Sequence, residues 1–95
     1  MRLRYTREAL ADLDAALEHS AKHWPQVAER VQGRIQTLIH LLLQHPHIGQ
    51  LTSRRGMRRL IASPYPYLIF YRATEDEIII HGVRHSARRP STMPR

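Results

Sequence analysis

The sequence of 95 residues has no cysteine, which excludes disulfide bonds and thiolate metal sites. It also has no stretch of about 18 apolar residues, so no membrane partner is expected. The first residues, MRLRYTREALADLD, become acidic and amphipathic at once and lack the apolar core of a signal peptide. These absences together favour a cytoplasmic protein.

Lysine is nearly absent too, although the chain is strongly basic. It holds 15 Lys and Arg residues against eight Asp and Glu, with a formal net charge of +7, and only Lys22 is a lysine. Residues 51–95 carry about +6 of this net charge. A GC-rich genome would explain the arginine preference, but it would not explain the clustering. Since the arginine fork suits phosphate and carboxylate, the second half is expected to meet nucleic acid, a ribonucleoprotein or an acidic protein.

The first half predicts a short strand followed by two helices. Residues 2–5 alternate polar and apolar side chains, as a strand does. Thr6 is a candidate N-cap. Apolar residues at steps of three and four predict helices over residues 7–22 and 25–44, which would form an antiparallel hairpin. Gly33 costs the second helix about 1 kcal/mol relative to alanine, and we expect it to permit close approach of the first helix.

The second half predicts an antiparallel meander of three strands. A basic loop over residues 50–56 leads to strands over 57–62, 67–72 and 77–85, with SPYP and ATED as the turns. The last strand contains the nearly continuous apolar run IIIHGV, so it is expected inside the sheet. The order β-α-α-β-β-β therefore predicts an α+β fold. Its helical hairpin would pack on one face of a small, mostly antiparallel sheet.

The length supports one domain, which we place at residues 1–90. The end of the chain holds prolines and shows no apolar periodicity. Residues 91–95 are therefore expected to form a flexible tail.

Cationic side chains gather at two places on the predicted sheet. One group follows the last strand and the other covers the loop and the start of the second strand. Alternation along that strand would send Arg58 and Arg59 to opposite faces, one to pair with a carboxylate and the other to face solvent. A solubilising tail and surface histidines are the structural alternatives to binding. The candidate target-binding residues are Arg54, Arg55, Arg59, Arg84, His85, Arg88 and Arg89.

Two other groups of side chains are explained better by structure than by ligands. The aromatic residues between 65 and 71 could stack on bases, but core and sheet packing is the more common role. His40, His45 and His47 have spacings that match no common zinc pattern, with no acid or thiol nearby. Neither a metal nor a cofactor is predicted.

Several motifs, spread over about residues 3–90, together resemble the ParE/RelE superfamily of bacterial toxins. The chain opens with Y-T-x-x-A-x-x-D-L and leaves its second helix with LLLQHPHIG. It continues with R-x-L-I-x-S-P-Y-P-Y-L-I-F-Y-R and closes with V-R-H-x-A-R-R-P. No single motif is specific, but their joint occurrence is typical of the superfamily. The resemblance implies the toxin of a type II toxin–antitoxin pair, with a cognate acidic antitoxin.

Two activities divide this superfamily: RelE-like members cleave mRNA on the ribosome, and ParE-like members poison DNA gyrase. RelE-like ribonucleases place an arginine in the third strand, where this chain has Tyr67. As a metal-independent ribonuclease, the chain would have Arg84, His85 and Arg58 as its catalytic candidates. Tyr67 instead favours a ParE-like inhibitor of gyrase without a catalytic site. Ribosome-dependent mRNA cleavage, or a non-toxic homologue that only binds antitoxin, are the alternatives.

Overall fold

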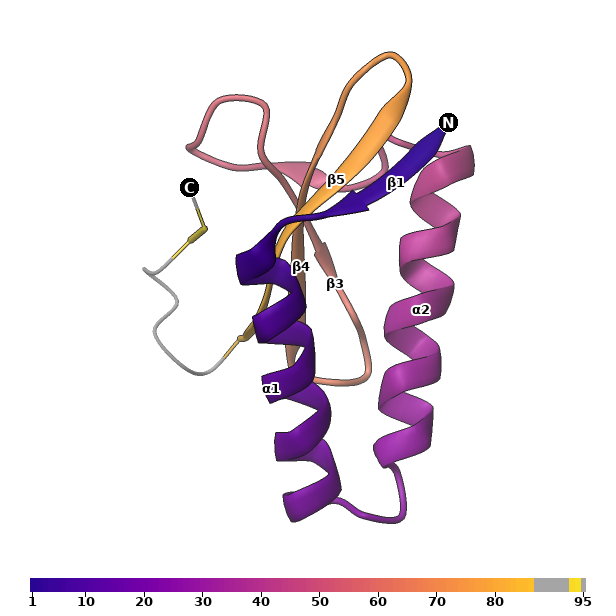
Figure 1. Cartoon of the computed structure of the whole chain (residues 1–95), viewed down its shortest axis with the longest axis vertical. Helices are drawn as coiled ribbons and strands as arrows, with labels where there is room; N and C mark the ends of the chain where they lie inside the picture. Colours follow the sequence, from indigo (N-terminus) through magenta and orange to yellow (C-terminus); the bar gives the residue numbers. More distant parts are fainter. Residues whose placement is uncertain (87–92, 95) are drawn as a thin grey trace.

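In the described part of the chain, two helices pack against a five-stranded sheet (Figure 1). The computed structural model describes residues 1–86, 93 and 94. The strands lie in the order β1-β5-β4-β3-β2; β1 is parallel to β5, and the other neighbouring pairs are antiparallel. The predicted α+β fold is confirmed, with one added short strand. The elements are β1 (Arg2–Tyr5), α1 (Arg7–His23), α2 (Ala28–Gln44), β2 (Gln50–Leu51), β3 (Arg58–Ile61), β4 (Tyr67–Ala73) and β5 (Glu77–His85).

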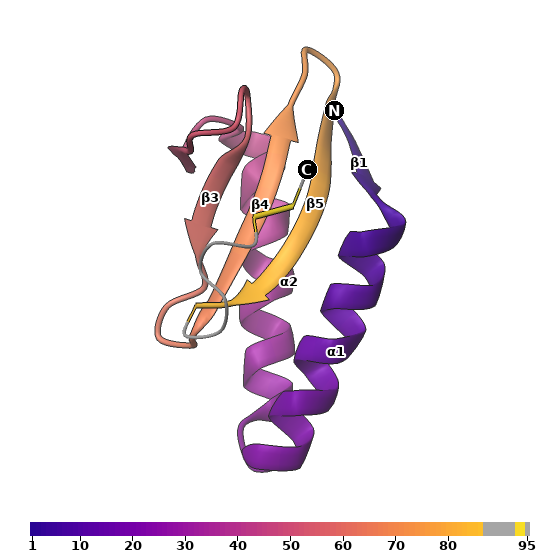
Figure 2. The same cartoon turned by 90° about the vertical axis from the view of Figure 1, so that its left-hand side faces the viewer.

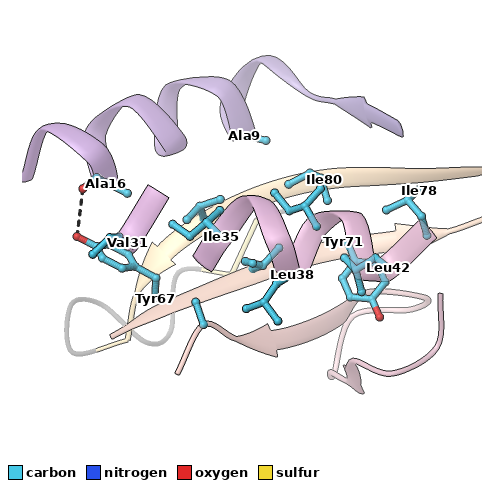
Figure 3. Close-up of a cluster of buried hydrophobic side chains, with 14 residues drawn as sticks. Ala9, Ala16, Val31, Ile35, Leu38, Leu42, Tyr67, Tyr71, Ile78 and Ile80 are labelled. Carbon is cyan, nitrogen blue, oxygen red and sulfur yellow. Dashed lines mark hydrogen bonds between the residues drawn. The ribbon is translucent and has the colours of Figure 1, made fainter. Parts of the chain in front are cut away.

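Both helices lie on one side of the sheet, which we call the inner face. In Figure 2, α2 passes behind the strands, and α1 lies beside β5 on the side of β1. The apolar stripe of α2, with Ile35, Leu38 and Leu42, meets Ile78 and Ile80 of β5 (Figure 3). Burying each such side chain stabilises the fold by about 1.5–3 kcal/mol, so this layer holds α2 on the sheet.

The opposite side of the sheet, the outer face, is covered in part by the end of the chain. Phe70 of β4 and Gly82 of β5 are cross-strand neighbours there. Pro94 is fully buried, and a Cβ added at Gly82 would lie 2.8 Å from Pro94 Cγ. Figure 2 shows residues 93 and 94 in front of β4 and β5. The rest of the predicted tail, 91–95, lies outside the described residues, so its flexibility stays a prediction.

The helix ends follow local hydrogen bonding. Thr6 caps α1 as predicted, because its Oγ1 accepts the backbone N–H of Ala9 at 3.0 Å. The predicted start of the second helix at residue 25 is wrong by about one turn. Residues 25–27 form a turn in which Val27 donates its N–H to the Trp24 carbonyl at 2.9 Å, so the helix begins only at Ala28. Within residues 1–86, neither helix is long and apolar enough to cross a bilayer.

The predicted loop over residues 50–56 begins with a strand. Gln50 and Leu51 form β2 and pair with Arg59 and Arg58 of β3. Two residues are too few to show an alternating pattern, which explains why the sequence did not reveal β2.

Packing explains the aromatic residues of β4, as the sequence predicted. Tyr67, Phe70 and Tyr71 are at most 4% exposed. Tyr71 connects β4 to the exit of α2: its hydroxyl accepts the Gly49 N–H at 2.8 Å and donates to the Pro46 carbonyl at 2.9 Å. Burial raises the pKa of this phenol above its ordinary value, so it keeps the proton that it donates.

The glycines at 33 and 49 differ in the space around them. The expectation that Gly33 permits close approach of α1 is wrong, because an added Cβ there would meet no heavy atom within 4 Å. A Cβ at Gly49 would lie 2.6 Å from the Tyr71 hydroxyl oxygen. The second glycine is therefore the one that close packing requires.

We expect Gly49→Ala to destabilise the protein by about 1–3 kcal/mol, because the methyl group displaces the Tyr71 phenol and its hydrogen bonds. Gly33→Ala is the matched control and should stabilise the protein by about 0.5–1 kcal/mol, since alanine is the better helix former. Urea unfolding of both variants measures these changes. Equal effects at the two glycines would contradict the packing described for Tyr71.

Candidate functional site

Arg84, one of the candidate target-binding residues, is bound by two carboxylates of α1. Its Nε donates to Asp12 Oδ2 at 2.8 Å, and its Nη2 donates to Glu8 Oε1 at 2.5 Å. Asp12 Oδ2 also accepts the backbone N–H of Val83 at 3.1 Å. We call Glu8, Asp12, Val83 and Arg84 the α1–β5 clamp. Its acids neutralise the guanidinium, so a target would have to compete with them for Arg84.

Among the described residues, the clamp forms where β5 has β4 on one side and no strand on the other. β1 pairs with β5 only as far as Ile80, so the edge of β5 beyond that point is bordered by α1. Asp12 therefore accepts an N–H that a longer β1 would otherwise have bonded. Burial raises the pKa of the Asp12 carboxyl, while the hydrogen bond from Val83 and the charge of Arg84 act in the opposite direction.

His85 lies on the other side of the strand from Arg84. It pairs in register with Tyr67, whose ring centroid lies 5.4 Å from that of His85. The ring of His19 in α1 is 5.6 Å away. His85 thus packs among rings on the inner face, and strand alternation turns Arg84 to the outer face. The structure does not bring this imidazole and this guanidinium together.

In the second arginine group, Arg58 and Arg59 of β3 bind carbonyl oxygens. Arg58 donates to the His47 carbonyl at 3.1 Å and to the Gly49 carbonyl at 2.8 Å. Arg59 donates to Gln50 Oε1 at 3.1 Å. The prediction that either Arg58 or Arg59 pairs with a carboxylate is wrong, because the residues that follow α2 bring carbonyl groups to this edge of the sheet.

Arg54 and Arg55 are exposed in the loop between β2 and β3. Arg88 and Arg89 fall outside the described residues. All four therefore stay predictions as target contacts.

The three ribonuclease candidates do not form one constellation. Arg58 pairs in register with Tyr71, whereas His85 pairs with Tyr67. Those two positions are four residues apart on β4, or about 13 Å at 3.3 Å per residue. Arg84 is turned to the opposite face and bound by α1. General acid–base chemistry requires its groups within hydrogen-bond reach of one substrate, and these three side chains are spread over both faces of the sheet.

Tyr67 occupies the position where the resemblance would put an arginine in a ribonuclease. It is 2% exposed. Its hydroxyl donates to the Ala16 carbonyl at 3.3 Å, and the Ser20 hydroxyl is 3.3 Å away (Figure 3 shows the Ala16 contact). This side chain is part of the contact between β4 and α1, and its phenol is not presented to a substrate.

Sequence reasoning missed the two acids of the clamp. Glu8 and Asp12 are four residues apart, so they lie on the same side of α1. Two acids on one side of a helix, together with a strand that ends in arginine, therefore indicate a possible ion pair between the two elements. Over residues 1–86, no group of three His, Asp or Glu side chains is placed to hold a metal ion.

We expect Asp12→Ala to destabilise the fold by about 1–3 kcal/mol, because the Val83 N–H and the half-buried Arg84 lose their partner. Glu8→Ala is the matched control: its side chain is 54% exposed, and its loss should cost about 1 kcal/mol or less. Urea unfolding measures the difference. A smaller effect at Asp12 than at Glu8 would show that the edge of β5 does not depend on this carboxylate.

Comparisons with known proteins identify the family of this chain. The model of the family described as "ParE toxin of type II toxin-antitoxin system, parDE" matches residues 3–90. Toxin RelE2 of Caulobacter vibrioides is 33% identical over 84 residues, which cover 88% of this chain and 93% of that protein. A putative toxin, Y4kP of Sinorhizobium fredii, is 34% identical over 79 residues, covering 83% of this chain and 82% of that protein.

Solved structures agree. The chromosomal ParDE system from P. aeruginosa contains a chain that is 27% identical, with a TM-score of 0.77, over 90% of this chain and 95% of that one. The E. coli DinJ–YafQ complex contains a chain with the same fold at 15% identity, with a TM-score of 0.67, over 94% of this chain and 98% of that one. The chain described here therefore belongs to the ParE toxin family of type II toxin–antitoxin systems.

Proposed function

We propose that this chain is a toxin that inhibits DNA gyrase by binding to it, without an active site of its own, and that a cognate acidic antitoxin neutralises it. The observation that carries the proposal is Tyr67. A buried phenol that bonds to α1 stands where an RNA-cleaving relative would need an arginine. The dispersal of Arg58, Arg84 and His85 over the sheet supports the same conclusion.

Charge and exposed apolar surface support an antitoxin partner. The chain has a net charge of +7, which favours an acidic protein. Large apolar side chains are exposed near the end of α2 and in β2: Leu41 is 37%, Ile48 is 45% and Leu51 is 60% exposed. Such surface suits docking of an apolar segment. The similar structures from P. aeruginosa and E. coli were solved as a toxin–antitoxin system and as a two-protein complex.

Ribosome-dependent mRNA cleavage is the second candidate. It is favoured by the 33% identity to a protein named Toxin RelE2. A non-toxic homologue that only binds antitoxin is the third.

A paired assay separates these candidates: supercoiling by purified gyrase, beside primer-extension mapping of mRNA on ribosomes. We expect inhibition of supercoiling and no new mRNA ends. Ribosomal cuts with unaffected gyrase would contradict the proposal in favour of cleavage, and no effect in either assay would favour the inactive homologue.

Within this assay, Arg88→Ala/Arg89→Ala should weaken inhibition of gyrase by about tenfold or more, since charge-assisted hydrogen bonds contribute about 1.5–3 kcal/mol each. Arg7→Ala/Arg30→Ala is the control, because it removes the same charge from exposed positions on the helices. Binding to the antitoxin, measured by calorimetry, should persist in the tail variant. Equal loss of inhibition in both double variants would show that only total charge matters.

A further inference from the structure

We propose that Arg4, Arg72 and His81 form a phosphate-binding site on the outer face of the sheet, and that its ligand is the backbone of a nucleic acid. Its three side chains come from β1, β4 and β5, and none of them is among the target-binding residues predicted from the sequence. It goes beyond the proposed inhibition of gyrase and does not depend on it.

The strand register brings the two arginines to the same place. Arg4 of β1 pairs with Ile79 of β5, and Ile79 pairs with Arg72 of β4. Their Cα atoms are thus two strand spacings apart, or about 10 Å. Ile78 and Ile80 face the inner core, so alternation turns Ile79 and both arginines outward. Two long cationic side chains therefore flank Ile79 on the outer face, close enough for both to reach one anion.

A β-bulge adds the imidazole. Tyr71 pairs with Ile80 and Phe70 with Gly82, so His81 has no partner in the register. A bulge of this kind re-aims a side chain, and bulges are frequent beside functional sites. His81 is turned to the outer face, where Arg72 Nη1 lies 3.5 Å from His81 Nε2. Thr6, which follows β1, helps to hold the bulge, since its Oγ1 donates to the His81 carbonyl at 3.4 Å.

The electrostatics of the cluster favour an added negative charge. Burial lowers the pKa of His81, and the charges of Arg72 and Arg4 lower it further, against an opposing effect of Glu8. Arg4 donates two hydrogen bonds to Glu77, at 3.2 and 3.4 Å, and its side chain is 59% exposed, so a phosphate can reach this guanidinium but must compete with the Glu77 carboxylate. A bound phosphate would relieve the repulsion among the three groups and would raise the pKa of His81.

The shape of the cationic surface favours a polymer of phosphates over a single anion. Donors from three strands can meet oxygens that point in different directions, as those of a phosphate do. Arg2 extends the row along β1, and Arg59 extends it onto β3, both on the outer face. A row of arginines across a sheet is the pattern expected for backbone contacts.

The test is fluorescence anisotropy of a labelled DNA duplex with the full chain over a series of salt concentrations. Arg4→Gln/Arg72→Gln should weaken binding and reduce the slope of log K against log salt by about two, one for each lost phosphate contact. Arg7→Gln/Arg30→Gln removes the same charge elsewhere and should leave the slope unchanged. Arg72 also donates to the Arg55 carbonyl at 3.1 Å, so the double variant could disturb the fold. Arg4→Gln alone avoids this and should change the slope by about one.

Equal slopes for the site and control variants, or a wild-type chain that does not bind DNA, would overturn the proposal. Labelled polyglutamate serves as a second probe. If Arg4→Gln weakened the binding of polyglutamate but not that of DNA, the proposal would also be overturned, because the site would then serve an acidic protein. Neither gyrase nor antitoxin is in the assay, so these outcomes leave the proposed function untouched.

An NMR titration of the His81 ring provides an independent measurement. The free protein should show a His81 pKa below 6.5, and saturation with the duplex should raise it, since the anion favours the imidazolium. Binding should therefore tighten as the pH falls through the pKa of His81. An unchanged His81 pKa in the bound state would rule out a phosphate beside this ring.

Discussion

The difference in length between β1 and β5 determines how this domain is held together. β1 has four residues and β5 has nine, so the second half of β5 runs past its parallel neighbour with an open edge. α1 follows β1 directly and lies along that edge. Asp12 binds both the exposed N–H of Val83 and the guanidinium of Arg84, so one carboxylate replaces the missing strand at this point.

Alternation along β5 then places the two basic residues at its end in different environments. Arg84 turns to the outer face and is held by acids, whereas His85 turns inward among aromatic rings. Two residues that are adjacent in sequence thus have different chemistry. The bulge at His81 changes this division locally, because His81 and Gly82 both face outward. Gly82 leaves space that Pro94 fills, while His81 joins the arginines of the neighbouring strands.

Local patterns were enough to predict most of the fold. The steps of three and four in the helices, the Thr6 cap and the strand runs all gave correct elements, because each depends on residues close in sequence. The start of α2 was misjudged, since Pro25 suits both a turn and a first helical position. The clamp joins residues 72 positions apart, and His81 owes its orientation to a register shift between β4 and β5. Neither follows from a local pattern, so the sequence could indicate the arginines but not their partners.

Tyr67 connects β4 of the sheet to α1. Its phenol is bonded to the Ala16 carbonyl and lies against Ser20, so α1 is fitted to a tyrosine at this position. An arginine there would bring a charge into the space that Tyr67 shares with the Ala16 carbonyl, the Ser20 hydroxyl and the His85 ring, and an uncompensated buried charge costs several kcal/mol. Acquiring a catalytic arginine would therefore require α1 to move or to change its own residues. The tyrosine at this position is thus tied to how α1 packs on the sheet, and a single Tyr67→Arg substitution on β4 would disturb the contact between β4 and α1.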